Sequence, residues 1–538
     1  MRHGGQILVD QLKIQCVDRV FCVPGESYLA ALDGLFDSGI DTIVGRNEGG
    51  VSMMAEAYGK LTGRPGVAMV TRGPGATNAS GGVHVAFQDS TPMILFVGQV
   101  ASDQRDREAF QEVDYRQMFG PLAKWVAEID RTDRIPEYIS RAFHVAVSGR
   151  PGPVVLALPE DMLSATSDVA DAPRANPARQ HISQSAVNDV LGEMARARNP
   201  LMLIGGPLWS AQAARDVATL ADQTGWPIAT TFRCQDYIDN RHPNYIGDLG
   251  IGPNPALAER VAAADTLLVL GARLGEMTSG GYSLFQIPKP TQRLIHIHPN
   301  ADELGRVYQA DLAISCHSND FLAQAVIATQ GQFAPAPVTE RAAYEHWQTP
   351  TATPGAVKLE QIISHLTQTL PDTAIITNGA GNYAAWLHRY YRYKSYRTQL
   401  APTSGTMGYG LPAAVSAKLM HPDRDVICLA GDGCFQMNGQ EFGTAVQYGA
   451  NIIVIIANNG VYGTIRMHQA RQYPNRPSGT DMVNPDFAAL ARAYGGHGET
   501  VTQTDQFAAA LSRARAANKP AIIDLKTDPA AVSHRTPQ

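Results

Sequence analysis

The residues best suited to chemistry in this sequence are an aspartate and an asparagine that each follow an apolar run. Asp432 lies in a GDG sequence directly after residues 425–430, and Asn459 lies in an NNG sequence directly after residues 451–457. If both runs are neighbouring parallel strands, their carboxyl ends meet at the sheet edge where ligands of open α/β sheets bind. Carboxylate, amide and backbone oxygens suit Mg2+, which shares its coordination with diphosphates, and flanking glycines let backbone approach phosphate closely. Each motif alone is also an ordinary turn or loop signal, so the prediction of a magnesium and diphosphate site depends on the pair.

The segment between these two runs predicts a helix over residues 439–448. Asn438 occupies the N-cap position, Glu441 stands in capping-box position, and Gly449 follows where a helix would stop. A helix between the two runs is what makes them parallel neighbours in one sheet.

A second group of candidate residues lies near the N-terminus. Glu48 follows the apolar residues 42–44 and opens a helical pattern, which predicts that its carboxylate lies at a strand-to-helix corner. An acid at a helix N-terminus also complements the helix dipole, so the position alone does not establish a chemical role. A Gly-rich turn over residues 71–78 follows an expected strand at residues 67–70, and Asn78 is placed to cap or orient that turn.

The elements that must position these residues belong to the α/β class. Short apolar runs alternate with helical patterns along the chain of 538 residues, as in parallel sheets flanked by helices. Two proline-rich segments with few apolar residues, 164–180 and 330–354, predict linkers. We therefore expect three doubly wound parallel-sheet domains at residues 1–165, 182–330 and 355–530, each of ordinary domain size.

Composition excludes several other classes of protein. A formal net charge of −6, with 17% charged residues, predicts no basic surface for nucleic acid or for an anionic membrane. No apolar run approaches the roughly 20 residues of a membrane helix, and the N-terminus lacks the pattern of a signal peptide. We therefore expect a cytoplasmic protein with no nucleic-acid or membrane partner. The six cysteines form no CxxC pair and are expected to be buried thiols.

These motifs resemble those of the acetolactate synthase group of thiamine diphosphate-dependent enzymes, and the resemblance covers nearly the whole chain. GDG and NN match the cofactor motif of the family, residues 403–412 match the segment beneath the middle of the cofactor, and residues 46–48 match an RxE segment. The resemblance implies a pyrimidine-binding first domain, a central domain, and a third domain for the diphosphate and Mg2+. The implied cofactor-binding residues are Pro24, Gly25, Glu48, Thr71, Gly73, Asn78, Gly405, Met407, Gly431, Asp432, Gly433, Asn459, Val461, Tyr462 and Gly463.

The resemblance also implies roles within this set. Mg2+ would be ligated by the side chains of Asp432 and Asn459 and by the backbone carbonyl of Val461, and Met407 would be a wedge between the two rings of the cofactor. Glu48, the implied catalytic residue, would hydrogen-bond the pyrimidine ring nitrogen, so that the cofactor deprotonates its own thiazolium C2. The ylid would attack a carbonyl, and bond cleavage would leave an enamine, while the protein supplies positioning and electrostatics.

Substrate choice depends on the pocket, and here the sequence departs from the group it resembles. Glu26 stands where acetolactate synthases carry glycine, His468 where they carry tryptophan, and Glu160 where lysine is common. His84 and His468 could shuttle protons, and Gln88 could orient a substrate by hydrogen bonding. The candidate substrate-pocket residues are Glu26, Phe110, Gln111, His84, Gln88 and His468.

Three functions remain open at this point. The first is a carboligase that decarboxylates a 2-oxo acid, as the acetolactate synthase resemblance implies. The second is a carbon-carbon lyase or 2-oxo-acid decarboxylase of the benzaldehyde lyase or benzoylformate decarboxylase type, which suits the altered pocket. The third is a cofactor-binding relative without activity, which would not require Glu48.

The expected partners are small 2-oxo acids or aldehydes and further copies of the chain. In the family that the sequence resembles, the two halves of the site come from different subunits, so a homodimer or homotetramer with active sites at subunit interfaces is expected. Some members also hold FAD in the central domain. Residues 247–252 depart from the usual FAD-contacting segment and no strict GxGxxG is present, so FAD binding stays open.

Overall fold

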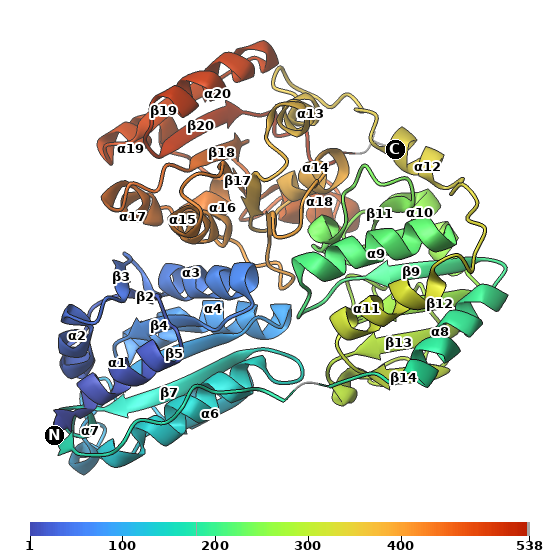
Figure 1. Cartoon of the computed structure of the whole chain (residues 1–538). Coiled ribbons are helices and arrows are strands. Elements are labelled where there is room, and N and C mark those ends of the chain that lie inside the picture. Colours follow the sequence, from blue (N-terminus) through green and yellow to red (C-terminus); the bar gives the residue numbers. More distant parts are fainter. Residues whose placement is uncertain (179, 535–538) are drawn as a thin grey trace.

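The computed structural model of the chain describes residues 1–178 and 180–534 and contains three six-stranded parallel sheets flanked by helices (Figure 1). Figure 1 shows three lobes, the first blue to cyan, the second green to yellow and the third orange to red. The predicted α/β class with three parallel-sheet domains is therefore confirmed. No helix in the described residues is long and apolar enough to cross a membrane.

The first domain is built on a sheet whose central strands are completely buried. In β5 all seven side chains from Met93 to Gln99 are buried, as expected for a strand covered by helices on both faces. A short antiparallel pair, β1 (Arg2–His3) with β8 (Thr166–Ser167), closes one end. The sheet strands are β2 (Arg19–Cys22), β3 (Asp41–Val44), β4 (Gly66–Val70), β5 (Met93–Gln99), β6 (Trp125–Glu128) and β7 (Pro153–Pro159), and the helices are α1 (Gly4–Ile14), α2 (Leu29–Phe36), α3 (Glu48–Thr62), α4 (Pro74–Asp89), α5 (Tyr115–Phe119), α6 (Ile135–Val147) and α7 (Glu160–Ser164).

The central domain follows an extended segment and carries the second sheet. Its strands are β9 (Pro200–Ile204), β10 (Ile228–Thr230), β11 (Tyr245–Asp248), β12 (Thr266–Leu270), β13 (Arg293–His298) and β14 (Leu312–Ser315), and its helices are α8 (Gln184–Arg196), α9 (Ala211–Thr224), α10 (Pro255–Ala262) and α11 (Ser318–Thr329). Arg150 of the first domain and Arg273 of the central domain both bond the buried carboxylate of Glu303, at 2.8 and 3.1 Å. This shared acid ties the two domains together, since a buried carboxylate needs its partners.

The third domain contains the third sheet. Its strands are β15 (Ile375–Asn378), β16 (Gln399–Leu400), β17 (Val426–Gly431), β18 (Ile453–Asn458), β19 (His497–Val501) and β20 (Ala521–Lys526), and its helices are α13 (Leu359–Thr369), α14 (Tyr383–Tyr390), α15 (Gly410–Met420), α16 (Asp432–Gln436), α17 (Glu441–Gln447), α18 (Gly463–Gln472), α19 (Phe487–Ala493) and α20 (Phe507–Ala516).

The first and third sheets share one strand order, which no sequence repeat had indicated. Counted along each domain, the order is 2-1-3-4-6-5 in both, whereas the central sheet has the order 3-2-1-4-5-6. In each order the first strand of the domain has later strands on both sides, so the connections leave it in opposite directions, and the loops at the carboxyl ends beside that switch point form the crevice where ligands of such sheets bind. In the first sheet this point lies between β2 and β4, in the central sheet between β9 and β12, and in the third between β15 and β17.

The first and third domains of the chain share a single apolar core. It combines side chains of α3, such as Met54, with side chains of α15, such as Leu411, and these two helices pack against each other (Figure 1). Within the same contact the hydroxyl of Tyr409 donates to Glu56 at 2.5 Å and the hydroxyl of Ser416 donates to the carbonyl of Met54 at 2.9 Å. The two domains are therefore one packed unit rather than two lobes on a flexible linker.

Several local expectations from the sequence were wrong. The helix expected over residues 439–448 is present as α17, but its N-cap is Gln440 rather than Asn438, without a side-chain cap, and a further short helix, α16, precedes it. Asn438 and Glu441 instead bond distant segments, since both are buried where other partners are within reach. The expected linker 330–354 contains helix α12 (Arg341–Trp347), whose Tyr344 is buried against the central domain. Five cysteines are buried thiols as expected, but Cys16 is exposed.

Candidate functional site

Asp432 begins α16 directly after β17, and neighbouring backbone groups fix its carboxylate. Oδ1 accepts from the backbone N–H of Gly433 at 2.8 Å, and Oδ2 accepts from those of Asn459 at 3.1 Å and Gly460 at 2.7 Å. Because β17 and β18 are parallel neighbours, the GDG and NNG turns lie side by side at one sheet edge. The carboxylate is thus aimed before any ligand is present.

Asn484 is a member of this group that the sequence did not reveal. Its side-chain N–H2 donates to Asp432 Oδ2 and to Asn458 Oδ1, both at 2.8 Å, and Asn458 in turn donates to the buried Asp524 at 2.9 Å. Asn484 lies in an irregular segment with no motif around it, so no local pattern could have identified it. Its two bonds orient Asp432 and the end of β18 together.

Met407 lies in a turn that two separate hydrogen bonds hold in place. The backbone carbonyl of Gly408 accepts from the side chain of Asn438 at 3.1 Å, and its N–H donates to the thiol sulfur of Cys434 at 3.3 Å. Gly405 and Gly408 both have positive φ, 66° and 80°, a conformation that favours glycine. Met407 itself is only partly buried, so its side chain is free to contact a ligand in the adjoining cavity.

These residues surround a cavity of about 270 Å3, which we call the Asp432 cavity. Of the residues expected to bind the cofactor, it is lined by Gly405, Met407, Gly431, Asp432, Gly433, Asn459, Val461, Tyr462 and Gly463. A Cβ on Gly431 would lie 3.0 Å from the ring of Tyr383, and one on Gly433 would lie 2.7 Å from the ring of Tyr462, so only glycine leaves this wall open.

The chemistry of this cavity suits a cation only together with an anionic ligand. Residues 1–178 and 180–534 contain no cluster of three or more His, Cys, Asp or Glu side chains that could hold a metal. A divalent cation beside Asp432 would have one carboxylate, the amide oxygen of Asn459 and backbone oxygens. That donor set fits Mg2+ whose remaining ligands are diphosphate oxygens.

The other predicted residues gather at the ligand edge of the first sheet, in what we call the Glu48 corner: Pro24, Gly25, Glu48, Thr71, Gly73 and Asn78. Asn78 of α4 donates to Glu48 Oε2 at 3.0 Å, so it orients the acid. The loops after β2 and β4 touch, since Thr71 and Ser27 share a hydrogen bond of 2.9 Å and a Cβ on Gly25 would lie 2.4 Å from Thr71 Cβ.

A residue of the third domain, Glu441, bonds the turn that precedes Glu48. One carboxylate oxygen of Glu441, the first residue of α17, accepts from the backbone N–H groups of Arg46 at 3.0 Å and Asn47 at 2.9 Å. The other accepts from Thr444, at 2.6 Å. Burial raises the pKa of Glu441 above its usual value, and these hydrogen bonds oppose the increase. Asn47 is also the N-cap of α3, so Glu441 helps to set the start of the helix that presents Glu48.

Within one chain the Glu48 corner and the Asp432 cavity do not meet. None of the described residues of the first domain lines the Asp432 cavity. Glu26 and Phe110 are exposed at the Glu48 corner, and Gln111 packs against Gly73, where a Cβ would lie 2.7 Å from its own.

The remaining substrate-pocket candidates lie elsewhere. His84 and Gln88 line a different cavity, and His468 is exposed on α18 without lining the Asp432 cavity. The structure therefore gathers the cofactor candidates into two groups but does not gather the substrate candidates into one pocket.

Comparison with family models shows which class of protein has this arrangement. Residues 2–118 match the N-terminal TPP binding domain of thiamine pyrophosphate enzymes, residues 187–325 match their central domain, and residues 379–525 match their C-terminal TPP binding domain. The first match contains the Glu48 corner, and the last contains the cofactor candidates that line the Asp432 cavity. The chain is thus a thiamine diphosphate-dependent enzyme.

Comparison with individual proteins places the chain in one group of these enzymes. The chain is 30% identical to the acetolactate synthase isozyme 2 large subunit of Escherichia coli K12, over 98% of this chain and 96% of that protein. It is also 30% identical to the acetolactate synthase large subunit of Corynebacterium glutamicum, over 97% and 86%, and to the mitochondrial catalytic subunit of Saccharomyces cerevisiae acetolactate synthase, over 98% and 80%. Within its family the chain belongs to the acetolactate synthase-like group.

Substitution of Glu441 tests the contact behind Glu48. Glu441→Ala leaves the backbone N–H groups of Arg46 and Asn47 without their acceptor, so we expect the free energy of unfolding to fall by about 3 kcal/mol. Glu441→Gln keeps an acceptor and is the matched control, with a much smaller loss expected. The measurement is urea unfolding of both variants and the wild type, and equal stability of the alanine variant would contradict the proposed contact.

The difference in stability between the wild type and Glu441→Gln should depend on pH, and the pKa of Glu441 sets the direction. Because the pKa of Glu441 is raised in the folded state, its protonation favours folding below its unfolded pKa, and this contribution is lost as pH rises through the folded value. We therefore expect the stability of the wild type relative to Glu441→Gln to be greatest at acid pH and to decline toward neutral pH.

Proposed function

We propose that the chain binds thiamine diphosphate with Mg2+, decarboxylates a 2-oxo acid and joins the remaining fragment to a second carbonyl compound. The observation that carries this proposal is the pair of sites at matching switch points of two sheets: a glycine-walled cavity beside one fixed carboxylate, and an oriented acid at the Glu48 corner. The relatives named acetolactate synthases support the reaction class.

In this proposal the third domain binds the charged end of the cofactor. Asp432, Asn459 and the carbonyl of Val461 would hold Mg2+, and the open glycine wall would admit the diphosphate. The bound cofactor supplies a carbon that adds to a carbonyl and then accepts the electron pair of the broken bond. Met407 would hold the rings of the cofactor from beneath, on a turn pinned by Asn438 and Cys434.

Glu48 is the residue that would assist proton transfer within the cofactor. Asn78 occupies Oε2 of its carboxylate, which leaves Oε1 to hydrogen-bond a ring nitrogen of the pyrimidine. The acid is only partly buried in one chain, and docking against a second molecule would remove its remaining water. A hydrogen bond between Oε1 and the ring nitrogen would then be shielded from water, and a shielded hydrogen bond is stronger than one in water.

We further propose that two copies of the chain complete each site. The Glu48 corner and the Asp432 cavity belong to one packed unit yet do not meet in it, so a second copy must supply the missing half. Exposed apolar side chains near both halves fit such an interface: Phe110 is 77% exposed at the first, and Ile465 and Val483 are exposed beside the second. A homodimer, or a tetramer built from such dimers, satisfies this geometry.

Mixing two inactive variants tests the shared site. Glu48→Gln and Asp432→Ala should each be inactive alone, but subunit exchange should produce mixed dimers with one intact site and recover about a quarter of wild-type activity. Mixing Glu48→Gln with itself after the same treatment is the control. No recovery, despite exchange shown by native mass spectrometry, would mean that each site is made within one chain.

The reaction is tested by product analysis. Purified protein incubated with thiamine diphosphate, Mg2+ and pyruvate, with and without an added aldehyde, should give acetolactate or another carboligation product in NMR spectra. Glu48→Gln should bind the cofactor, as measured by calorimetry, but lose turnover by at least about 100-fold. Free aldehyde as the main product would favour a lyase or decarboxylase instead.

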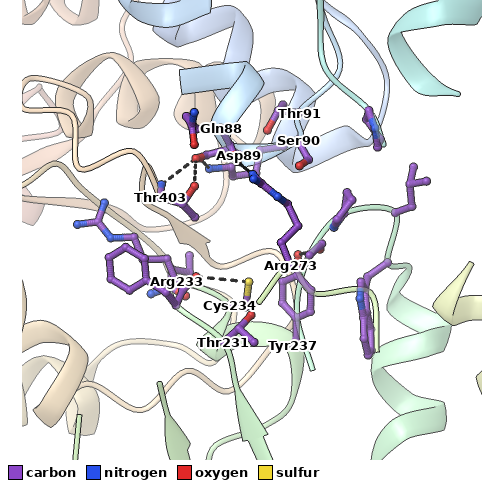
Figure 2. A pocket seen from close by; sticks show the side chains of 18 of the residues that line it. Gln88, Asp89, Ser90, Thr91, Thr231, Arg233, Cys234, Tyr237, Arg273 and Thr403 are labelled. Atoms are coloured by element: carbon purple, nitrogen blue, oxygen red, sulfur yellow. Dashed lines mark hydrogen bonds and ion pairs between the residues drawn. The ribbon is translucent and has the colours of Figure 1, made fainter. Parts of the chain in front are cut away.

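We further propose that FAD, which the sequence left open, binds where the three domains meet. A cavity of about 920 Å3, which we call the junction cavity, lies where the three domains meet (Figure 2). It opens at the switch point of the central sheet, between the loops after β9 and β12, and Arg233 and Arg273 line it. We infer that this crevice takes the dinucleotide, since its order 3-2-1-4-5-6 is the one that binds dinucleotides.

The junction cavity also touches the turn of Met407. Figure 2 shows Asp89 bonded to Thr403, whose N–H donates to it at 2.8 Å, and Arg233 donates to the carbonyls of Pro402 and Gly379.

Flavin absorbance tests the proposed FAD site. Purified protein should carry flavin absorbance, and heat denaturation should release the flavin into the filtrate. A colourless preparation that takes up no added FAD would contradict this assignment.

A further inference from the structure

The loop over residues 102–112, which we call the entrance loop, is held in a strained conformation. Asp106, Glu108 and Gln111 have φ angles of 62°, 53° and 66°, in the left-handed region that residues other than glycine rarely adopt. Such backbone persists only where surrounding contacts hold it, and it concentrates at functional sites. The entrance loop carries Phe110, whose ring is exposed, and Gln111, which packs on Gly73 of the Glu48 corner.

One set of contacts holds the loop from within. The carboxylate of Glu112 accepts from the backbone N–H groups of Asp106 at 2.9 Å and Ala109 at 3.1 Å. Arg105 pairs with Glu112 at 3.3 Å and with Glu128 of β6 at 2.5 Å. The pair with Glu128 also ties the start of the loop to β6, but none of these bonds involves Phe110 or Gln111.

The first two residues of α7 anchor the loop at both ends. Asp161 accepts from the N–H of Ser102 at 3.0 Å and from its hydroxyl at 3.2 Å. Glu160 pairs with Arg72, and Arg72 Nε donates to the carbonyl of Phe110 at 3.1 Å. Because β5 lies between β4 and β7, the side chain of Arg72, which follows β4, reaches across the end of β5 to Glu160, which follows β7.

We propose that the Arg72–Glu160 pair is a latch that holds Phe110 and Gln111 beside the Glu48 corner and so strengthens binding of the 2-oxo acid. This inference rests on the proposed function. Arg72 and Glu160 are positioning residues, because they act through the loop. The latch also accounts for the departure at Glu160, since an acid there is the partner that an arginine in the Gly-rich turn requires.

The geometry separates this role from that of an ordinary ion pair. The side chain of Glu160 is 40% exposed and that of Arg72 is 13% exposed, so their attraction alone contributes little to global stability. The hydrogen bond from Nε to the carbonyl of Phe110 is a separate feature that only a guanidinium supplies. Lysine at position 72 could pair with Glu160 but could not make both contacts in the same fork geometry.

Hydrogen exchange of the cofactor-loaded enzyme tests the latch without substrate. In Arg72→Ala, amides within residues 101–115 should exchange about 10-fold faster, with no change in the midpoint of global unfolding. Arg72→Lys should resemble Arg72→Ala, whereas Glu160→Gln, which still accepts from the guanidinium, should resemble wild type. Arg131→Ala, which removes an exposed pair with Asp133 in the same domain, is the control and should change nothing.

Kinetics test the consequence for substrate. Arg72→Ala should raise KM for the 2-oxo acid about 10-fold and change kcat less than about 2-fold, with unchanged affinity for thiamine diphosphate. The latch would be overturned if Arg72→Lys behaved like the wild type in both hydrogen exchange and kinetics. It would also be overturned if exchange in Arg72→Ala were unchanged. Faster exchange with unchanged KM would overturn its role toward substrate. Wild-type enzyme that turns over no 2-oxo acid would refute the proposed function instead, and the exchange data would still decide whether the latch exists.

Discussion

The buried carboxylate of Glu441 is the contact on which the arrangement of this molecule depends most. It accepts two backbone N–H groups from the turn before Glu48, and so it joins the Glu48 corner to the domain that contains the Asp432 cavity. Without it, two N–H groups in the turn after β3 would lose their acceptor. The shared core of α3 and α15 brings the domains together, and Glu441 fixes the position of one against the other.

Two sheets of the same order place their chemistry at equivalent points. The loops beside the reversal carry Gly25 and Thr71 in the first domain, and Gly431 and Asp432 in the third. The central sheet uses the other common order and places its crevice at the junction of all three domains. Each domain thus offers a ligand edge, although their sequences differ, because strand order alone decides where such an edge opens.

Much of the fold and the centre of the site could be predicted from the sequence. Apolar runs ending in GDG and NNG identified β17 and β18, and an acid after residues 42–44 identified the start of α3, because strand ends and helix starts have local signals. Asn484, Arg72 and Glu441 had none. Their roles come from partners far along the chain, and a capping-box spacing even suggested the wrong partner for Glu441. Long-range contacts of this kind are not encoded in any short window of sequence.

The common core of the first and third domains has a consequence for control. Since each copy packs these domains on itself, a lone copy can reach its folded state while both halves of its site lack a counterpart. In the proposed dimer, folding and assembly are then separate equilibria. The working fraction would follow the protein concentration in the cell, and dilution would silence the enzyme without unfolding it.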